Sequence, residues 1–201
     1  MGKRWVKERK RDYYYRKAKE MGARSRAYFK LLQINRRYRV LRRGMRVLDL
    51  GAAPGGWSRA ALELVGGEGF VVGVDLKRIE PMEGAVFIRG DVRRESTLKK
   101  VEEVSKEFDV IISDMSPNIS GIYTVDQARS AELALTALEV AERFLKVGGA
   151  MVVKLFEGED TKEVLKEYRK RFSRVDLTSP KASRTSSSEI YIIARGFGQS
   201  R

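Results

Sequence analysis

The sequence predicts an α/β fold built on a doubly wound, mostly parallel sheet of seven strands. Short apolar runs rich in β-branched residues alternate along the chain with longer segments of helical periodicity, which is typical of a parallel sheet covered by helices. The first of these apolar runs leads directly into a glycine-rich turn, Gly51 to Gly56, as happens where a strand of such a sheet passes into its helix.

The elements follow from the same alternation. We expect strands at Arg46–Leu50, Phe70–Asp75, Val86–Arg89, Val110–Asp114, Ala150–Phe156, Arg174–Leu177 and Glu189–Arg195. We expect helices at Ser25–Gln33, Trp57–Val65, Leu98–Glu107, Asp126–Phe144 and Lys162–Arg171. Only the turn-rich segment Ser179–Ser188 separates the last two strands, so we predict that they pair as an antiparallel hairpin.

Positive charge is concentrated in the first quarter of the chain. The formal net charge is +14, and residues 1–46 hold 18 Lys and Arg against three acidic residues, while the rest holds 23 against 24. This asymmetry predicts an anionic polymer as partner, with nucleic acid favoured over a membrane surface, although a merely solvated basic tail is the alternative. Trp5 and the run Tyr13–Tyr15 suit stacking on unpaired bases, or equally the pinning of a helix to the core. We expect a basic extension at residues 1–24 and one domain at 25–201.

Missing residue types narrow the chemistry. The chain has no cysteine and no histidine, so disulfides, thiolate-bound metal and the commonest general base are excluded, and we expect no metal. Acid–base work must come from Lys, Asp, Glu or Tyr. The sequence has no run of eighteen or more apolar residues and opens on charge, so we expect a cytoplasmic protein without a membrane segment. We also expect a monomer, although no feature of the sequence argues for it.

The glycine-rich turn predicts a ligand site. Glycine lets the backbone turn tightly and approach a ligand, and the next helix begins where an anion is favoured, so a dinucleotide site has to be considered. Here Ala53 takes the place of the second glycine of the dinucleotide motif, and Pro54 stiffens the turn. Asp49 precedes the turn and would repel a pyrophosphate, which favours a cationic ligand without phosphate, such as S-adenosylmethionine. A purely structural turn remains the alternative.

Two acidic residues at strand ends suit a nucleoside. Asp75 follows Gly51 by 24 residues, at the end of the second predicted strand, where a carboxylate accepts hydrogen bonds from ribose hydroxyls. Asp91 comes just after the third strand, within reach of an adenine amino group.

Several longer motifs, in order, carry a resemblance. They are SRAYFKL at 25–31, DLGAAPGGWS at 49–58, SDMSPNISG at 113–121, GG at 148–149 with VVK at 152–154, and SR at 183–184 with SEIY at 188–191. From about Ala23 to Gly196 the chain resembles the FtsJ/RrmJ family of ribose 2′-O-methyltransferases, whose fold is the Rossmann-like fold of class I methyltransferases.

The resemblance implies a catalytic tetrad and a cofactor. The tetrad is Lys30, Asp114, Lys154 and Glu189, and the cofactor is S-adenosyl-L-methionine. The implied cofactor contacts are Gly55, Trp57, Asp75, Asp91 and Asp114. At Trp57 the resemblance favours a backbone contact, whereas the residue alone would equally suit shielding of the cofactor or the core.

Topology supports part of this tetrad independently. Asp114 and Lys154 fall at the carboxyl ends of predicted parallel strands, where open α/β sheets bind ligands. Glu189 begins an antiparallel strand and therefore reaches the same edge, while Lys30 depends on the resemblance. Lys154 is the candidate base for the ribose hydroxyl proton; alternatively it stays charged and orients the oxygen. The segment after Asp114 is predicted to be a loop over the acceptor pocket, or an ordinary connector.

The resemblance implies, as the leading function, methylation of a uridine ribose in large-subunit (23S) ribosomal RNA by an enzyme that uses S-adenosylmethionine. A tRNA ribose methyltransferase is the alternative with the same chemistry, and the tetrad does not separate the two. An RNA-binding assembly factor without catalysis is opposed by the complete tetrad. A nicotinamide-dependent oxidoreductase is opposed by the proline-containing turn and by the basic first quarter.

Overall fold

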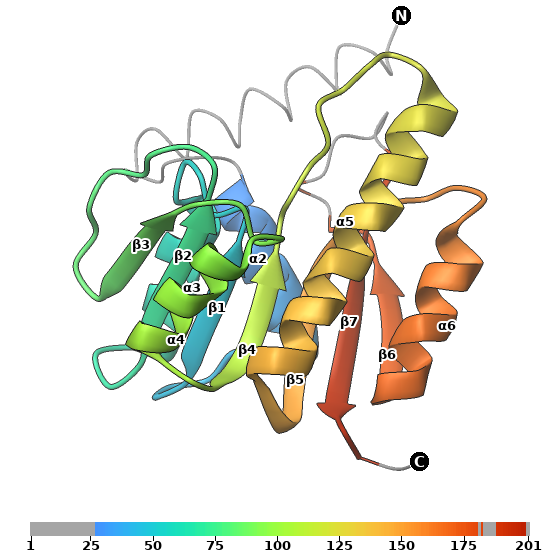
Figure 1. The fold of residues 1–201 in the computed structure, drawn as a ribbon. Coiled ribbons are helices and arrows are strands. Elements are labelled where there is room, and N and C mark those ends of the chain that lie inside the picture. Colours follow the sequence, from blue (N-terminus) through green and yellow to red (C-terminus); the bar gives the residue numbers. More distant parts are fainter. Residues whose placement is uncertain (1–26, 181, 183–187, 200–201) are drawn as a thin grey trace, which may run out of the picture.

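A computed structural model describes residues 27–180, 182 and 188–199 of the chain (Figure 1). Its helices are α2 (Ala27–Tyr38), α3 (Gly56–Val65), α4 (Glu95–Val104), α5 (Tyr123–Phe144) and α6 (Thr161–Arg171). Its strands are β1 (Arg46–Leu50), β2 (Phe70–Asp75), β3 (Ala85–Arg89), β4 (Phe108–Ser113), β5 (Leu145–Phe156), β6 (Phe172–Thr178) and β7 (Glu189–Phe197). The predicted extension at residues 1–24 lies outside the described residues.

All seven strands form one sheet, in the order β3-β2-β1-β4-β5-β7-β6. Each neighbouring pair from β3 to β5 is parallel, whereas β7 runs antiparallel to both β5 and β6. Figure 1 shows the arrow of β7 pointing away from the edge where the other arrows end. The doubly wound sheet and its closing antiparallel hairpin are thus confirmed.

Helices cover both faces of this sheet and bury two separate cores. On one face, α2 and α3 pack over apolar residues of the central strands, among them Val47, Val110 and Val152. On the other face, α4, α5 and α6 pack over the alternate residues, such as Leu48 and Ile111. Both faces are apolar because a parallel sheet has no solvated side, which is why its strands read as continuous apolar runs.

Several boundaries differ from those that the sequence predicted. The prediction for α4 was wrong at both ends, since the helix spans Glu95–Val104 rather than Leu98–Glu107. Its buried side chains are Thr97 and Val101, one turn apart. The buried face therefore begins before Leu98, the residue at which the sequence predicted the helix to start. The helix ends because Phe108 enters the core as the first residue of β4. Helices α2 and α5 and strand β5 are also longer than predicted.

In the described ranges, no helix is both long enough and apolar enough to cross a lipid bilayer.

Candidate active site

Polar residues replace apolar ones at the last positions of one sheet face. Successive side chains of a strand alternate between faces, so residues two apart share a face. Ile112 on β4, Val152 on β5 and Ile193 on β7 are fully buried under α2 and α3. Two residues nearer the carboxyl edge, the same rows continue as Asp114, Lys154 and Tyr191. The site is therefore the polar rim of a hydrophobic core.

Two ion pairs stand on this rim. Lys154 Nζ lies 3.2 Å from Asp114 Oδ1 and also donates a hydrogen bond to the backbone oxygen of Asp114 at 2.7 Å. Lys30, on α2, donates to Glu189 Oε2 at 2.8 Å. Both lysines are nearly buried, with 7% of Lys30 and 6% of Lys154 exposed. The structure thus brings all four residues of the implied tetrad together, Lys30 included.

Tyr191 joins the two pairs, and we did not assign it a role from the sequence. Its hydroxyl accepts a hydrogen bond from Lys30 Nζ at 3.1 Å and donates one to Asp114 Oδ1 at 3.1 Å. Its ring packs on Trp57, with 5.6 Å between the ring centroids. Period-two alternation from Glu189 was the available signal, because it places Tyr191 on the same face of β7.

A cavity of about 290 Å³ opens beside this rim. Its walls come from the ends of β1, β2 and β4, from the start of the segment after β3 and from α5; they include Gly51, Asp75, Asp91, Asp114, Met115 and Leu133. Gly51 has a φ of +74°, and a Cβ atom there would lie 2.7 Å from the Met115 side chain. Only glycine allows the chain to turn here and still leave room for Met115, in the segment that follows β4.

Three of the five implied cofactor residues line the cavity. Asp75 holds the turn closed, because its carboxylate accepts from the backbone nitrogens of Ala53 at 3.0 Å and Lys77 at 2.8 Å. Asp91 faces the cavity but is paired with Arg93, whose guanidinium hydrogen bonds hold the pKa of Asp91 below its ordinary value. Asp114 is shared between the cavity and the tetrad.

The other two, Gly55 and Trp57, are not among the described residues that line this cavity. Gly55 precedes α3 in a left-handed conformation with a φ of 105°. The Trp57 side chain is buried under Tyr191, so its ring belongs to the core, and only its backbone is left for a cofactor contact. No group of three or more acidic side chains in the described segments is arranged to hold a metal ion.

Asp49 is a fully buried acid beneath the glycine turn. Its Oδ2 accepts a hydrogen bond from the Ser58 hydroxyl at 2.6 Å. Burial raises its pKa to about 7, and the nearby carboxylates of Asp114 and Asp75 add to this rise, while the Ser58 hydrogen bond opposes it.

This raised pKa predicts a pH-dependent contribution to stability. The folded protein binds the Asp49 proton more tightly than the unfolded chain, so the stabilisation is complete below pH 4 and is lost as pH rises through about 7. Asp49→Asn keeps an acceptor for Ser58 and cannot ionise. We expect the variant to gain stability relative to the wild type, by a few kcal/mol, between pH 5 and pH 8. Urea unfolding at both pH values measures this, and a constant difference between the two proteins would contradict it.

Comparison with known proteins adds to this geometry. A sequence profile for a family described as FtsJ-like methyltransferase matches residues 23–197. The chain belongs to the FtsJ-like methyltransferase family. The two ion pairs, the glycine turn and the cavity therefore lie in a methyltransferase domain, as the motifs had implied.

Curated relatives in this family are close along nearly the whole chain. A protein of Methanothermobacter thermautotrophicus is 48% identical over 200 residues, which cover 98% of this chain and 95% of the relative. One of Methanothrix thermoacetophila is 51% identical over 186 residues, covering 92% and 72%. Both are named ribosomal RNA large subunit methyltransferase E.

Solved structures agree with this family fold. A crystal structure from Plasmodium falciparum, described as a ribosomal RNA methyltransferase, is 28% identical, with a TM-score of 0.78, and covers 88% of this chain and all of that one. A fibrillarin of Aeropyrum pernix, solved with S-adenosyl-L-methionine bound, is 18% identical, with a TM-score of 0.57, and covers 77% and 68%. The second likeness shows the fold alone.

Proposed function

We propose that this protein methylates the 2′-hydroxyl of a uridine ribose in large-subunit (23S) ribosomal RNA, with S-adenosylmethionine as methyl donor. One observation carries the proposal: the Lys30–Glu189 and Lys154–Asp114 pairs are linked through Tyr191, and Asp114 also lines the cavity. The names of the relatives supply the class of RNA.

The cavity suits the nucleoside part of the donor. Val92, Met115 and Leu133 offer an apolar wall for a purine, and the Asp75 carboxylate stands at the end of β2 for ribose hydroxyls. In this proposal the backbone of Gly55 and Trp57 provides further contacts. When bound, S-adenosylmethionine supplies an electrophilic methyl group on a sulfonium that is a good leaving group.

The chain's own residues then position the acceptor. Nearly buried and held by two acceptor atoms of Asp114, the Lys154 ammonium has little freedom, so it offers a fixed donor to the ribose oxygen. As a neutral amine the same group would take the hydroxyl proton. Tyr191 and Lys30 fix Asp114 and Glu189 in turn, so the acceptor side is organised before substrate arrives.

The described part of the basic first quarter supports an RNA partner. Arg36, Arg37, Arg39, Arg42 and Arg43 are all exposed, at the end of α2 and in the segment that leads to β1. β1 begins at the edge of the sheet opposite the site. The exposed arginines that lead into β1 therefore place positive charge at a distance from the site. Phosphate groups of a long RNA are the partners that such separated cations suit.

Mapping ribose methylation in cells that lack the protein tests the function. We expect one 2′-O-methyl mark to disappear from large-subunit ribosomal RNA and to return when the wild-type protein, but not Lys154→Ala, is supplied. A mark lost from tRNA, with ribosomal RNA unchanged, would assign the protein to the tRNA enzymes instead.

Deletion of residues 1–20 tests the predicted basic extension. We expect the truncated protein to bind RNA more weakly and with a shallower dependence on salt, because fewer phosphates are neutralised. Its affinity for S-adenosylmethionine should not change. Binding isotherms across a salt series measure the first quantity and calorimetry the second; equal RNA affinity at every salt concentration would refute the role of the extension.

A further inference from the structure

An apolar surface lies next to the cavity, in the segment between β4 and α5 and at the first residue of α5. Ile119, Ile122 and Tyr123 are 65%, 60% and 61% exposed. They are three of the eight large hydrophobic side chains that the described residues leave exposed, and they fall within five positions of the chain. Asn118, directly before them, lines the cavity wall. We call these three side chains the apolar rim.

The apolar rim is held in place by hydrogen bonds from α5. The buried Asp126 accepts from the backbone nitrogen and the hydroxyl of Ser120, both at 2.8 Å. Arg129 donates to the backbone oxygen of Asn118 at 3.3 Å. The Tyr123 hydroxyl donates to the backbone oxygen of Glu157 at 3.3 Å. A segment fixed in this way keeps its apolar side chains in water instead of folding them inward, which is unfavourable unless a ligand covers them.

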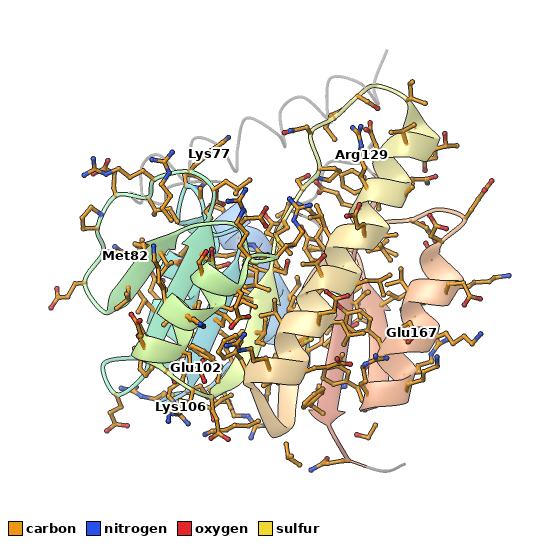
Figure 2. The ribbon with its side chains drawn as sticks, viewed as in Figure 1. Lys77, Met82, Glu102, Lys106, Arg129 and Glu167 are labelled. Carbon is orange, nitrogen blue, oxygen red and sulfur yellow. The ribbon has the colours of Figure 1, made fainter. Side chains whose placement is uncertain are left out.

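The charges around the apolar rim favour RNA as that ligand. Residues 115–125 include no charged side chain, in a chain of which 34% is charged, and the carboxylate of Asp126 is turned inward to the loop. A phosphate backbone therefore meets no carboxylate from residues 115–125, and the exposed Glu157, directly after β5, contacts the apolar rim through its backbone oxygen. Figure 2 shows Lys77 and Arg129 at the same edge of the sheet; both are exposed, and Lys77 lines the cavity. Cations beside apolar and aromatic side chains are the combination that binds unpaired nucleotides.

We propose that Ile119, Ile122 and Tyr123 form a stacking surface for unpaired bases next to the methylated nucleotide of the RNA. The inference rests on the proposed function, because it is the acceptor ribose at Lys154 that brings neighbouring bases over this segment. It adds a substrate requirement: the target nucleotide lies in a single-stranded or opened region, since paired bases offer no free face to these side chains.

Substitutions on the apolar rim test the inference. Tyr123→Ala and the double variant Ile119→Ser/Ile122→Ser are expected to raise the KM for a large-subunit ribosomal RNA transcript by about tenfold each, with kcat and cofactor affinity nearly unchanged. Tyr123→Phe keeps the ring, loses only the hydrogen bond to Glu157 and should behave as the wild type. Val147→Ser is the matched control, because Val147 is 76% exposed on β5 at the opposite edge.

Direct binding separates this inference from the proposed function. Fluorescence anisotropy with the same transcript, and with a short unstructured oligonucleotide, should show the same order of affinities. Unchanged RNA affinity and KM in the rim variants would overturn the stacking surface while leaving the methyltransferase assignment intact. If the wild type binds RNA through the apolar rim but methylates no RNA, the methyltransferase assignment is overturned and the stacking surface stands. Variants impaired only on ribosomal particles, and normal on naked RNA, would assign the rim to a protein and also overturn the inference.

Discussion

Replacement of Lys154 by alanine is expected to lower kcat for methyl transfer by about 10³-fold. Lys154 is the one tetrad residue whose ammonium is bound by both the side chain and the backbone of the residue that also lines the cavity, Asp114. In the proposed function, its loss removes the group that orients the acceptor oxygen, whereas the lining of the cavity is unchanged because Lys154 is not part of it. Single-turnover methylation measures the first effect, and calorimetry with S-adenosylmethionine checks the second.

Lys154→Arg decides how Lys154 acts. Arginine keeps a positive charge but does not deprotonate in a protein, so it cannot take the hydroxyl proton. If Lys154 is a general base, the arginine variant is as slow as the alanine variant at every pH. Near-normal activity in the arginine variant would reject the base and leave alignment of the oxygen as the source of the rate acceleration. The pH–rate profile of the wild type provides the reference.

Asp114→Ala is expected to impair both stability and activity. The Asp114 carboxylate is the shared acceptor for Lys154 and Tyr191, and its removal leaves a nearly buried ammonium without its counter-charge. Breaking a buried ion pair from one side costs about 3 kcal/mol or more. We expect a fall of that size in the free energy of unfolding, together with a loss of kcat comparable to that of Lys154→Ala.

A second substitution separates the two effects of Asp114. In Lys154→Met/Asp114→Ala neither charge of this ion pair remains, so we expect much of the lost stability to return while methylation stays absent. Asp109→Ala is the matched control. Asp109 pairs with Lys146 at 2.8 Å near the start of β4, at the other edge of the sheet, and is more exposed, so its loss should cost less stability and no activity. Recovery of methylation in the double variant would contradict the role given to both residues.

The sheet could be predicted from periodicity, and topology then brought three of the four tetrad residues named by the resemblance to one edge. Apolar runs gave the strands, and a strand order with parallel neighbours brings Asp114 and Lys154 to one edge without further information. Glu189 followed once the last strand was taken as antiparallel. Lys30 came from the resemblance alone, since nothing in its local sequence indicates that α2 brings its side chain to Glu189 and Tyr191 of β7.

Side-chain pairing was beyond the same reasoning. The hydrogen bonds of Tyr191 depend on where three separate elements place their side chains, and no pattern within β7 encodes that. The guanidinium of Arg93 donates a hydrogen bond to the carboxylate of Asp91, two positions earlier in the chain. The spacing of the two residues does not by itself predict this pairing. The ring of Trp57 is in the core because Tyr191 covers it, a contact between residues 134 positions apart in the chain. Long-range packing of this kind decides side-chain direction.

The register between β5 and β7 fixes the spacing of Lys154, Tyr191 and Glu189, whatever the length of the connection that leads into β7. Lys154 stands directly opposite Tyr191, and Phe156 opposite Glu189, so backbone hydrogen bonds of the ladder set their spacing. A shift of one residue would turn Tyr191 and Glu189 to the other face and abolish the site. Changes of length or composition in the connection between β6 and β7 need not disturb that ladder. The spacing between Lys154, Tyr191 and Glu189 is therefore a property of the sheet itself, fixed by the same ladder that completes the core.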